Sequence, residues 1–270
     1  MKVSLVLVSK NEEEYVKKFF ASLKKQTLKP DEVILVDSSS DNTAKIAKPF
    51  VDKLIVTPTK CAGHARNIGV KNSKGDIIVF TDVDTILHPD WLEELVKPFE
   101  NPKVSVVQGQ VFLRSYSGKN DKWMFSTGLK EEGRMYLNNC NSAFRRKVLK
   151  EFPLANDINW DDIELGYRLS KKYIIYGCKG AKVYHYGSKM EIRFKTNKDI
   201  WDYSFKYSLG YLQILKKYKN MYWFLRIWYN IFGSFIFAPN KKIGFKIFLF
   251  YVTSFFYILL FPNYALKVKK

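Results

Sequence analysis

The sequence predicts an α/β fold in which helices flank a mostly parallel β-sheet. Short apolar segments alternate with segments whose apolar residues recur at helical spacing, which is the pattern of strands joined by crossover helices. The apolar segments lack the alternating polarity of half-exposed strands, so both faces of the sheet should be covered. Polar residues gather after several strands, at the edge where such sheets bind their ligands.

The elements follow in order along the chain. The segment 3–8 is rich in β-branched residues and predicts a buried strand, and the segment 12–25 carries apolar residues at helical spacing. Asp41 is expected to cap the next helix. The predicted strands lie at 3–8, 33–36, 54–56, 77–81, 104–111 and 182–186, and the predicted helices at 12–25, 41–50, 64–72, 89–96 and 162–171.

Asp82 and Asp84 stand one residue apart where the strand 77–81 ends. Side chains two residues apart on a strand point the same way, so both carboxylates can face one ion. Oxygen ligands of this kind suit Mg²⁺ or Mn²⁺. Two acids with this spacing are also common at a turn before a helix, so the pair alone leaves both interpretations open.

The order of the surrounding segments narrows this choice. The stretch CAGHARNIGVKNSKGDIIVFTDVD, together with VSKNEEEY and VDSSSDNT before it, closely resembles the family 2 glycosyltransferases, which have the Rossmann-like GT-A fold. The resemblance covers about residues 3–190. It implies an enzyme that uses a nucleotide-diphosphate-sugar and a divalent metal ion, Mn²⁺ or Mg²⁺, and that inverts the configuration of the transferred sugar.

The resemblance also implies roles for individual residues. Asp84 is expected to hold the metal ion directly and Asp82 less directly, nearer the ribose, with His185 as a further metal ligand or diphosphate contact. Asp162 is expected to be the catalytic base, and the neighbouring Asp161 is the alternative. The nucleotide-sugar is expected to contact residues that follow the first, second and fourth strands and the helix 64–72, namely Ser9, Asn11, Glu12, Asp37, Arg66 and Asp82.

The acceptor side is less defined. The segment NNCNSAFRRKVL resembles the part of the family that lines it, and Asn141, Arg145 and Trp160 are expected there. The Gly-Gly-Phe-Asp stretch that often shapes acceptor specificity is missing, so the acceptor stays open. Cys61, Cys140 and Cys178 fit no zinc or redox spacing and are expected to be reduced thiols.

The chain of 270 residues carries a formal charge of +19, which indicates an anionic partner. Residues 201–270 hold 11 Lys or Arg and one acid, a net charge of +10. Two aromatic-rich apolar segments, 221–238 and 243–261, lie there with lysines on every side. This pattern predicts helices that lie on or re-enter a membrane from one face. A buried helical subdomain or a dimer interface is the alternative.

Together these features predict a GT-A catalytic domain at 1–200 and a helical, membrane-associating region at 201–270. The expected activity is transfer of a sugar to a lipid-linked or glycan acceptor at the cytoplasmic face of the cell membrane, with a polyprenyl-phosphate sugar synthase as the alternative. A nucleic-acid-binding protein is the rival of another class, but the basic residues do not fall into a known module. A nucleotidyltransferase would need a Gly-rich phosphate loop after the first strand, and VSKNEEEY has none.

Overall fold

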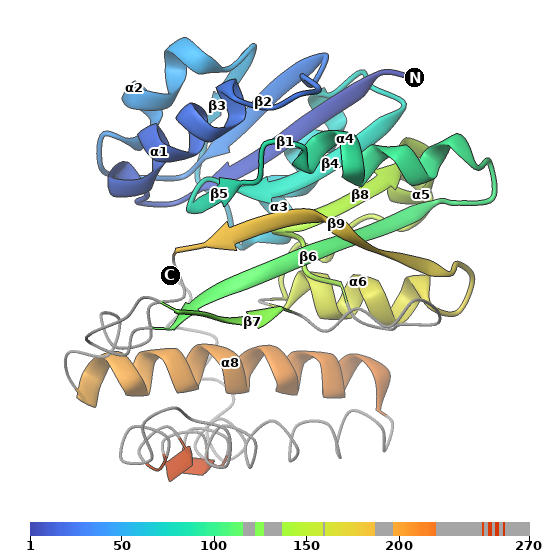
Figure 1. Cartoon of the computed structure of the whole chain (residues 1–270). Helices are drawn as coiled ribbons and strands as arrows, with labels where there is room; N and C mark the ends of the chain where they lie inside the picture. The colour runs from blue at the N-terminus through green and yellow to red at the C-terminus, as the bar shows by residue number, and fades with distance from the viewer. Residues whose placement is uncertain are drawn as a thin grey trace. The chain divides into compact units, whose positions relative to one another are not determined.

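The computed structural model describes residues 1–115, 122–126, 137–158, 160–186 and 197–219, with six further residues between 245 and 256. The chain divides into two compact units. The first comprises residues 1–157 and 161–189, and the second comprises residues 158–160 and 190–270. Figure 1 gives the labels of the elements used below.

The first unit is built on one nine-stranded sheet. Its strands run in the order β3-β2-β1-β4-β8-β6-β9-β5, and β7 pairs with β6 beside this path. The strands are β1 (Val3–Ser9), β2 (Glu32–Asp37), β3 (Lys53–Val56), β4 (Ile77–Asp82), β5 (Thr85–Leu87), β6 (Val106–Ser115), β7 (Lys122–Ser126), β8 (Asn141–Arg145) and β9 (Ile175–His185).

The prediction of a mostly parallel sheet holds for only one half of it. Strands β1, β2, β3 and β4 are all parallel, joined by helical crossovers. Beyond β4 the sheet becomes mixed, because β8 runs antiparallel to β4 and to β6, and β5 runs antiparallel to β9. The sheet of the first unit is therefore mixed. The strand ends at which the sequence predicts polar residues belong to its parallel half.

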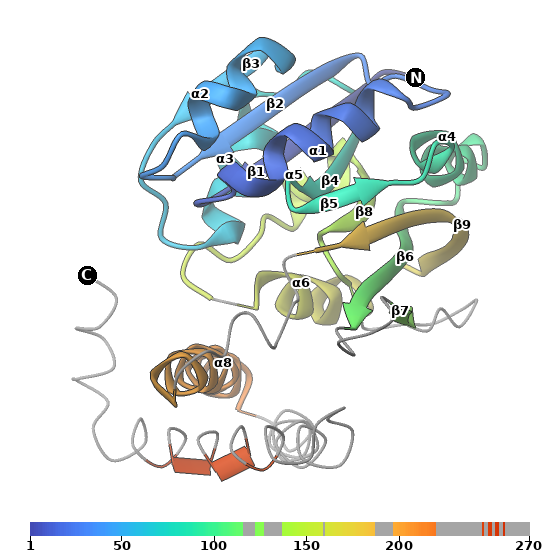
Figure 2. The same ribbon diagram turned by 60° about the vertical axis from the view of Figure 1, so that its left-hand side comes forward.

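Helices cover both faces of this sheet (Figures 1 and 2). Leu5 and Leu7 of β1 pack with the apolar faces of α1, α2 and α4, whereas Val6 between them packs with α5 and α6 on the opposite side. The helices of the first unit are α1 (Glu13–Lys24), α2 (Thr43–Ala47), α3 (Ala62–Asn72), α4 (Trp91–Val96), α5 (Arg146–Glu151) and α6 (Asp161–Leu169), with 3₁₀ turns η1 (Lys48–Phe50) and η2 (Lys97–Glu100).

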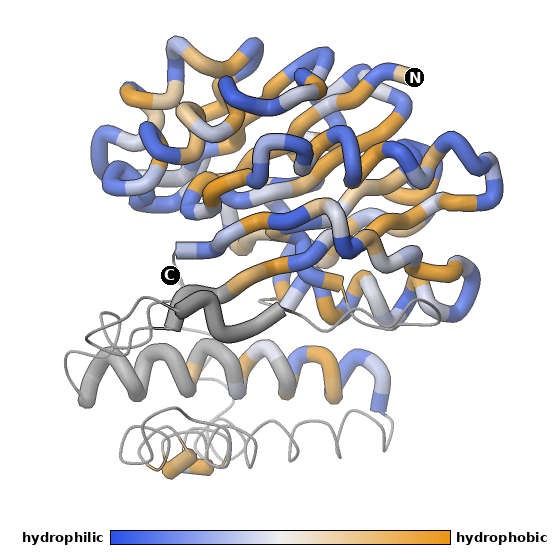
Figure 3. The backbone as a smooth tube through the Cα atoms, in the orientation of Figure 1, coloured by the Kyte–Doolittle hydropathy of each residue, from blue (hydrophilic) through white to orange (hydrophobic). Residues whose placement is uncertain are grey.

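The central strands are buried on both sides, as their composition predicts. In Figure 3 most of β1, β2 and β4 is coloured as hydrophobic and most of the connecting loops as hydrophilic. The largest fully buried side chains include Trp91 of α4, Phe19 of α1, Phe80 of β4 and Phe144 of β8, and β1 and β2 add buried leucine and isoleucine side chains. This core holds the strand ends in fixed positions.

The second unit contains α8 (Asn197–Tyr218), and the predicted domain boundary at residue 200 falls inside this helix. Ile214 of α8 is fully buried, and Gly210 lies close to Trp160. Within the described residues, we find no helix with both the length and the apolar character needed to cross a bilayer. The predicted apolar segments at 221–238 and 243–261 lie almost wholly outside those residues.

Candidate active site

The polar ends of three parallel strands meet at one edge of the sheet, as the sequence predicted. Ser9 at the end of β1 lies opposite Asp37 at the end of β2, and Val8 of β1 lies opposite Asp82 at the end of β4. Strand β2 lies beside β1 on one side and β4 lies beside it on the other, so the direction in which strands are added reverses at β1. This is the topological switch point where open α/β sheets bind their ligands.

Asp37 is fully buried at this edge. Its carboxylate accepts hydrogen bonds from the hydroxyl of Ser9 and from the backbone N–H and the hydroxyl of Ser39, the latter two at 3.1 and 2.6 Å. A buried carboxylate needs such donors to offset its lost hydration. Ser9 and Asp37 therefore form one hydrogen-bonded unit at the edge of the sheet.

Asn11 ties the loop after β1 to the loop after β2. Its backbone has a φ of 59°, a left-handed conformation that Asn tolerates better than most residues. The Asn11 amide oxygen accepts hydrogen bonds from the backbone N–H and the hydroxyl of Ser40, at 2.9 and 3.2 Å. The N–H of Glu12 donates to Thr43 Oγ1 at 2.9 Å. Asn11 and Glu12 thus lie in a loop that hydrogen bonds hold against the loop after β2, beside Asp37.

Arg66 on α3 is the buried cation of the site, with a relative exposure of 5%. One of its terminal nitrogens donates to Asp82 Oδ1 and the other to Asp161 Oδ2, both at 2.8 Å. The charges of Asp161 and Asp82 raise the pKa of the Arg66 guanidinium against the opposing effect of burial. A single guanidinium therefore joins the end of β4 to the start of α6.

The two adjacent acids at the start of α6 differ in their surroundings. Asp161 accepts a hydrogen bond from Asn139 at 3.1 Å in addition to that from Arg66. Burial raises the pKa of the Asp161 carboxyl above its ordinary value, although Arg66 opposes this. Burial first, and then the charge of Asp161, raise the pKa of Asp162 to about 7. A carboxyl with a pKa near neutrality is suited to exchange a proton with a substrate.

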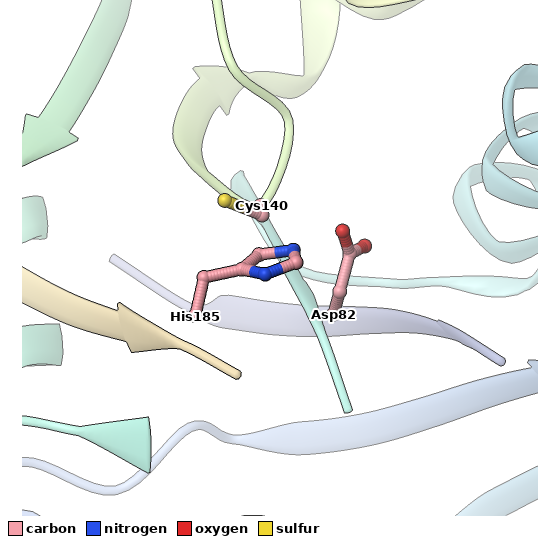
Figure 4. A group of neighbouring side chains, drawn as sticks. All are labelled: Asp82, Cys140 and His185. Carbon is pink, nitrogen blue, oxygen red and sulfur yellow. The ribbon is translucent and has the colours of Figure 1, made fainter. Parts of the chain in front are cut away.

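His185, Asp84 and Asp82 bring one imidazole and two carboxylates close together, and groups of this kind can hold a metal ion. The Nε2 atom of His185, at the end of β9, lies 3.6 Å from Asp84 Oδ1, and Asp84 itself is buried. Asp82, Cys140 and His185 each offer one ligand atom, and these atoms lie within 4.8 Å of one another (Figure 4). The donor set fits a divalent cation, because carboxylate oxygen and imidazole nitrogen both bind such ions.

Two residues predicted on the acceptor side, Asn141 and Arg145, take part in the packing of the sheet, and the acceptor role of Asn141 stays a prediction. Asn141 is fully buried; its side chain accepts a hydrogen bond from Trp91 Nε1 at 2.7 Å and donates to the carbonyls of Gln110 and Ala181 at 2.9 Å. Arg145 pairs with Ile77, at the opposite end of β4 from Asp82. The acceptor role predicted for Arg145 does not match this position.

The guanidinium of Arg145 is also occupied there. It donates to the carbonyls of Val104 and Phe99, both at 2.8 Å. Trp160, the third predicted acceptor contact, belongs to the second unit, where a Cβ added to Gly210 would lie 2.0 Å from its Cδ1 atom. Trp160 therefore packs closely on α8.

Three residues of the site were not predicted. Asn139 supports Asp161, and Cys140 lies beside His185 and Asp82. Gly63, at the start of α3, lets this helix approach α6, because an added Cβ would lie 2.3 Å from the carbonyl oxygen of Ala155 and 2.8 Å from Asp161 Cβ. The sequence signal for Gly63 was its place in the CAGHARN segment.

Comparison with known proteins agrees with this architecture. The sequence profile of glycosyl transferase family 2 matches residues 4–152, which is more than half of the chain. Glycosyltransferase AglE of Haloferax volcanii is 26% identical over 220 residues, which are 73% of this chain and 72% of that protein. The chain spans 46% of the glycosyltransferase YwdF of Bacillus subtilis, with 31% identity over 124 residues.

Solved structures show the same fold at low identity. The mannosyltransferase PcManGT of Pyrobaculum calidifontis, solved with GDP-Man and Mn²⁺, matches 99% of this chain and 78% of its own with a TM-score of 0.61 and 15% identity. TarS 1–349 of S. aureus, solved with UDP-GlcNAc, matches 78% of this chain and 67% of its own with a TM-score of 0.54 and 18% identity. With its GT-A-like sheet and the matched profile, the chain belongs to glycosyl transferase family 2.

Proposed function

We propose that this glycosyltransferase moves a sugar from a nucleoside-diphosphate sugar to a lipid-linked acceptor at the cytoplasmic face of the cell membrane, with inversion at the anomeric carbon. The observation that carries the proposed chemistry is the group formed by Arg66, Asp82, Asp161 and Asp162. It combines a buried cation, a carboxylate at a strand end and a carboxyl whose pKa is about 7.

Asp162 acts in this proposal as the general base. Its carboxylate takes the proton from the acceptor hydroxyl as that oxygen attacks the sugar. Arg66 and Asn139 hold Asp161 beside it, so burial and then the charge of Asp161 keep the pKa of Asp162 high enough to accept a proton. Asp161 is the alternative base, but its Oδ2 atom already accepts two hydrogen bonds.

The donor lies at the ends of β1, β2 and β4 in this proposal. Ser9 and Asp37, with the loops of Asn11 and Glu12, contact the nucleoside, and Asp82 lies near the ribose. Support comes from the hydrogen bonds that fix these groups at one edge of the sheet. Both UDP-sugars and GDP-mannose remain candidate donors, because the relatives that share the fold were solved with either nucleotide.

A divalent cation, Mn²⁺ or Mg²⁺, completes the proposed site, held by Asp84 and His185 with Asp82 beside them. When bound, it offsets the charge of the diphosphate and acts as a Lewis acid toward the leaving group. Arg66 contributes a second, permanent positive charge close to the same position through its bond to Asp82.

The membrane part of the proposal rests on the aromatic and lysine-rich composition of residues 201–270, which we propose as a membrane-associating region beside a catalytic region at 1–200. Sedimentation of the full chain with vesicles tests it. We expect binding to vesicles that contain anionic lipid and weaker binding to neutral ones. Equal, negligible sedimentation with both would refute the membrane association.

A thermal-shift screen of UDP- and GDP-sugars with and without Mn²⁺ tests the proposed donor class. A donor at 100 times its dissociation constant should stabilise the protein by about 2.7 kcal/mol. Stabilisation should require both the nucleotide and the metal ion. If no nucleotide-sugar stabilises the protein in the presence of metal, the proposal is wrong.

The variant Asp162→Asn separates the two acceptor classes. A hydroxyl acceptor must lose a proton, so the variant should lower kcat by roughly 10²–10⁴-fold. A polyprenyl phosphate is already ionised, and transfer to it should be nearly unchanged in the variant. Glu100→Gln, which removes an exposed carboxylate of η2, is the matched control and should behave as the wild type.

A further inference from the structure

Cys140 lies in the turn before β8 with its backbone held on both sides. Its carbonyl oxygen accepts a hydrogen bond from Thr81 Oγ1 of β4 at 2.8 Å, and its N–H donates to Asn138 Oδ1 at 3.1 Å. The residue is 3% exposed. The position of its sulfur is therefore set by the fold and not by the conformation of a surface loop.

The sulfur lies close to two side chains whose types can bind a metal ion. The ligand atoms of Cys140, Asp82 and His185 lie within 4.8 Å of one another, and Figure 4 shows these side chains as neighbours. They come from three segments far apart in the sequence, the end of β4, the turn before β8 and the end of β9. Arg66 occupies Oδ1 of Asp82, and a carboxylate has a second oxygen to offer.

This separation is compatible with one ion. Ligand bonds of about 2.0–2.3 Å arranged tetrahedrally imply ligand–ligand distances of about 3.5 Å, so distances of up to 4.8 Å would have to shorten by up to about 1.3 Å. Rotation of the imidazole and carboxylate about their side-chain bonds supplies a movement of that size. A set with sulfur, nitrogen and oxygen favours soft or borderline ions such as Zn²⁺, Cd²⁺ and Co²⁺, whereas Mg²⁺ and Mn²⁺ prefer oxygen.

We propose that Cys140 is a metal ligand and that, with Asp82 and His185, it makes this site selective for thiophilic divalent ions over Mg²⁺. On binding, the metal–sulfur bond forms, the thiol proton passes to solvent and no electrons are transferred. A zinc-like ion would therefore compete with the harder ion for His185 and Asp82. The proposal concerns metal coordination alone and stands whether or not the chain transfers a sugar.

Cobalt is a suitable probe, because a cobalt–thiolate bond absorbs in the near ultraviolet. Co²⁺ is titrated into the full chain after chelator treatment, and binding is counted by equilibrium dialysis. We expect a charge-transfer band that grows to one equivalent and disappears when Zn²⁺ is added. Cys140→Ser should abolish the band and weaken Co²⁺ binding by roughly tenfold or more, since it replaces a soft ligand with a poor one.

Cys178→Ser is the matched control. Cys178 is also buried, on β9, but its sulfur lies 3.3 Å from the carbonyl oxygen of Glu94, to which it donates. The band should be unchanged in this variant. A band that survives Cys140→Ser, or that disappears in Cys178→Ser while Co²⁺ still binds, would overturn the proposal.

A second measurement needs no substitution and covers the case in which Cys140→Ser fails to fold. X-ray absorption of the wild-type chain loaded with one equivalent of Zn²⁺ should show one sulfur neighbour at about 2.3 Å beside nitrogen and oxygen neighbours at about 2.0–2.2 Å. A zinc shell of nitrogen and oxygen alone would refute the role of Cys140.

Discussion

The raised pKa of Asp162 has a measurable consequence for stability. Burial and the neighbouring Asp161 raise this pKa from its ordinary value of 3.8 to about 7. A carboxyl whose pKa is higher in the folded state than in the unfolded state binds its proton more tightly when folded. Its contribution to stability is therefore fully present below pH 3.8 and is lost as the pH rises through 7. Asp162→Asn keeps the shape of the side chain and removes this dependence.

The magnitude follows from the size of the shift. A difference of about three pKa units corresponds to about 4 kcal/mol over the whole pH range, at 1.36 kcal/mol for each unit. About 2.5 kcal/mol of this falls between pH 5 and pH 8. These values are upper limits for Asp162, which is partly exposed. The Asn side chain can still accept the hydrogen bond that Ile163 N–H donates to Oδ1 at 2.8 Å.

Urea unfolding at several pH values between 5 and 8 measures the effect. The free energy of unfolding of Asp162→Asn, relative to that of the wild type, should rise steadily with pH, so the variant is favoured most at pH 8. Glu100→Gln, at an exposed position, should show no such trend. If the difference between Asp162→Asn and the wild type is the same at pH 5 and pH 8, Asp162 does not have a raised pKa and the assignment of its role loses its basis.

Three further predictions concern the same group of residues. Arg66→Gln leaves Asp82 and the buried Asp161 without their cation and should lower the free energy of unfolding by about 3–5 kcal/mol at pH 7. A loss below about 1 kcal/mol would mean that Arg66 does not pair with both carboxylates. Gly63→Ala places a Cβ 2.3 Å from the backbone carbonyl oxygen of Ala155 and 2.8 Å from Asp161 Cβ. It should therefore lower the free energy of unfolding, measured in urea, by about 1–3 kcal/mol. A variant as stable as the wild type would show that α3 and α6 do not approach so closely. With a hydroxyl acceptor, kcat should rise with pH around 7 as Asp162 loses its proton. Asp161→Asn removes a negative charge that raises the pKa of Asp162, so it should move this rise to lower pH. An unchanged pH profile would contradict the coupling between Asp161 and Asp162.

The parallel half of the fold was predictable from sequence because its strands are buried on both faces. Continuous apolar runs, each followed by a helix, gave the positions of β1, β2 and β4 to within one or two residues. The meeting of Ser9, Asp37 and Asp82 followed from the rule that parallel strands end at the same edge. The antiparallel β8 was not predicted, since burial on both faces removes the alternation that would mark it.

The site was predictable only where its residues belong to recognisable segments. Arg66, Asp161 and Asp162 stood out in this way, but their connection did not, because 95 residues separate Arg66 from Asp161. Cys140 was set aside because spacing rules describe ligands that lie close together in sequence. Arg145 was assigned to the acceptor side, and only the register of β8 against β4 shows that it lies at the far end of the strand.

The two hydrogen bonds of Arg66 to Asp82 and Asp161 also join segments that lie far apart in the chain. Asp82 lies 16 residues from Arg66 and ends β4 in the parallel half of the sheet, whereas Asp161 lies 95 residues from Arg66, beyond β8 in the chain. A fragment that ends before β8 retains the cation with one of its two carboxylate partners. A chain that ends between these segments keeps Arg66 and Asp82 but lacks both Asp161 and the proposed base Asp162.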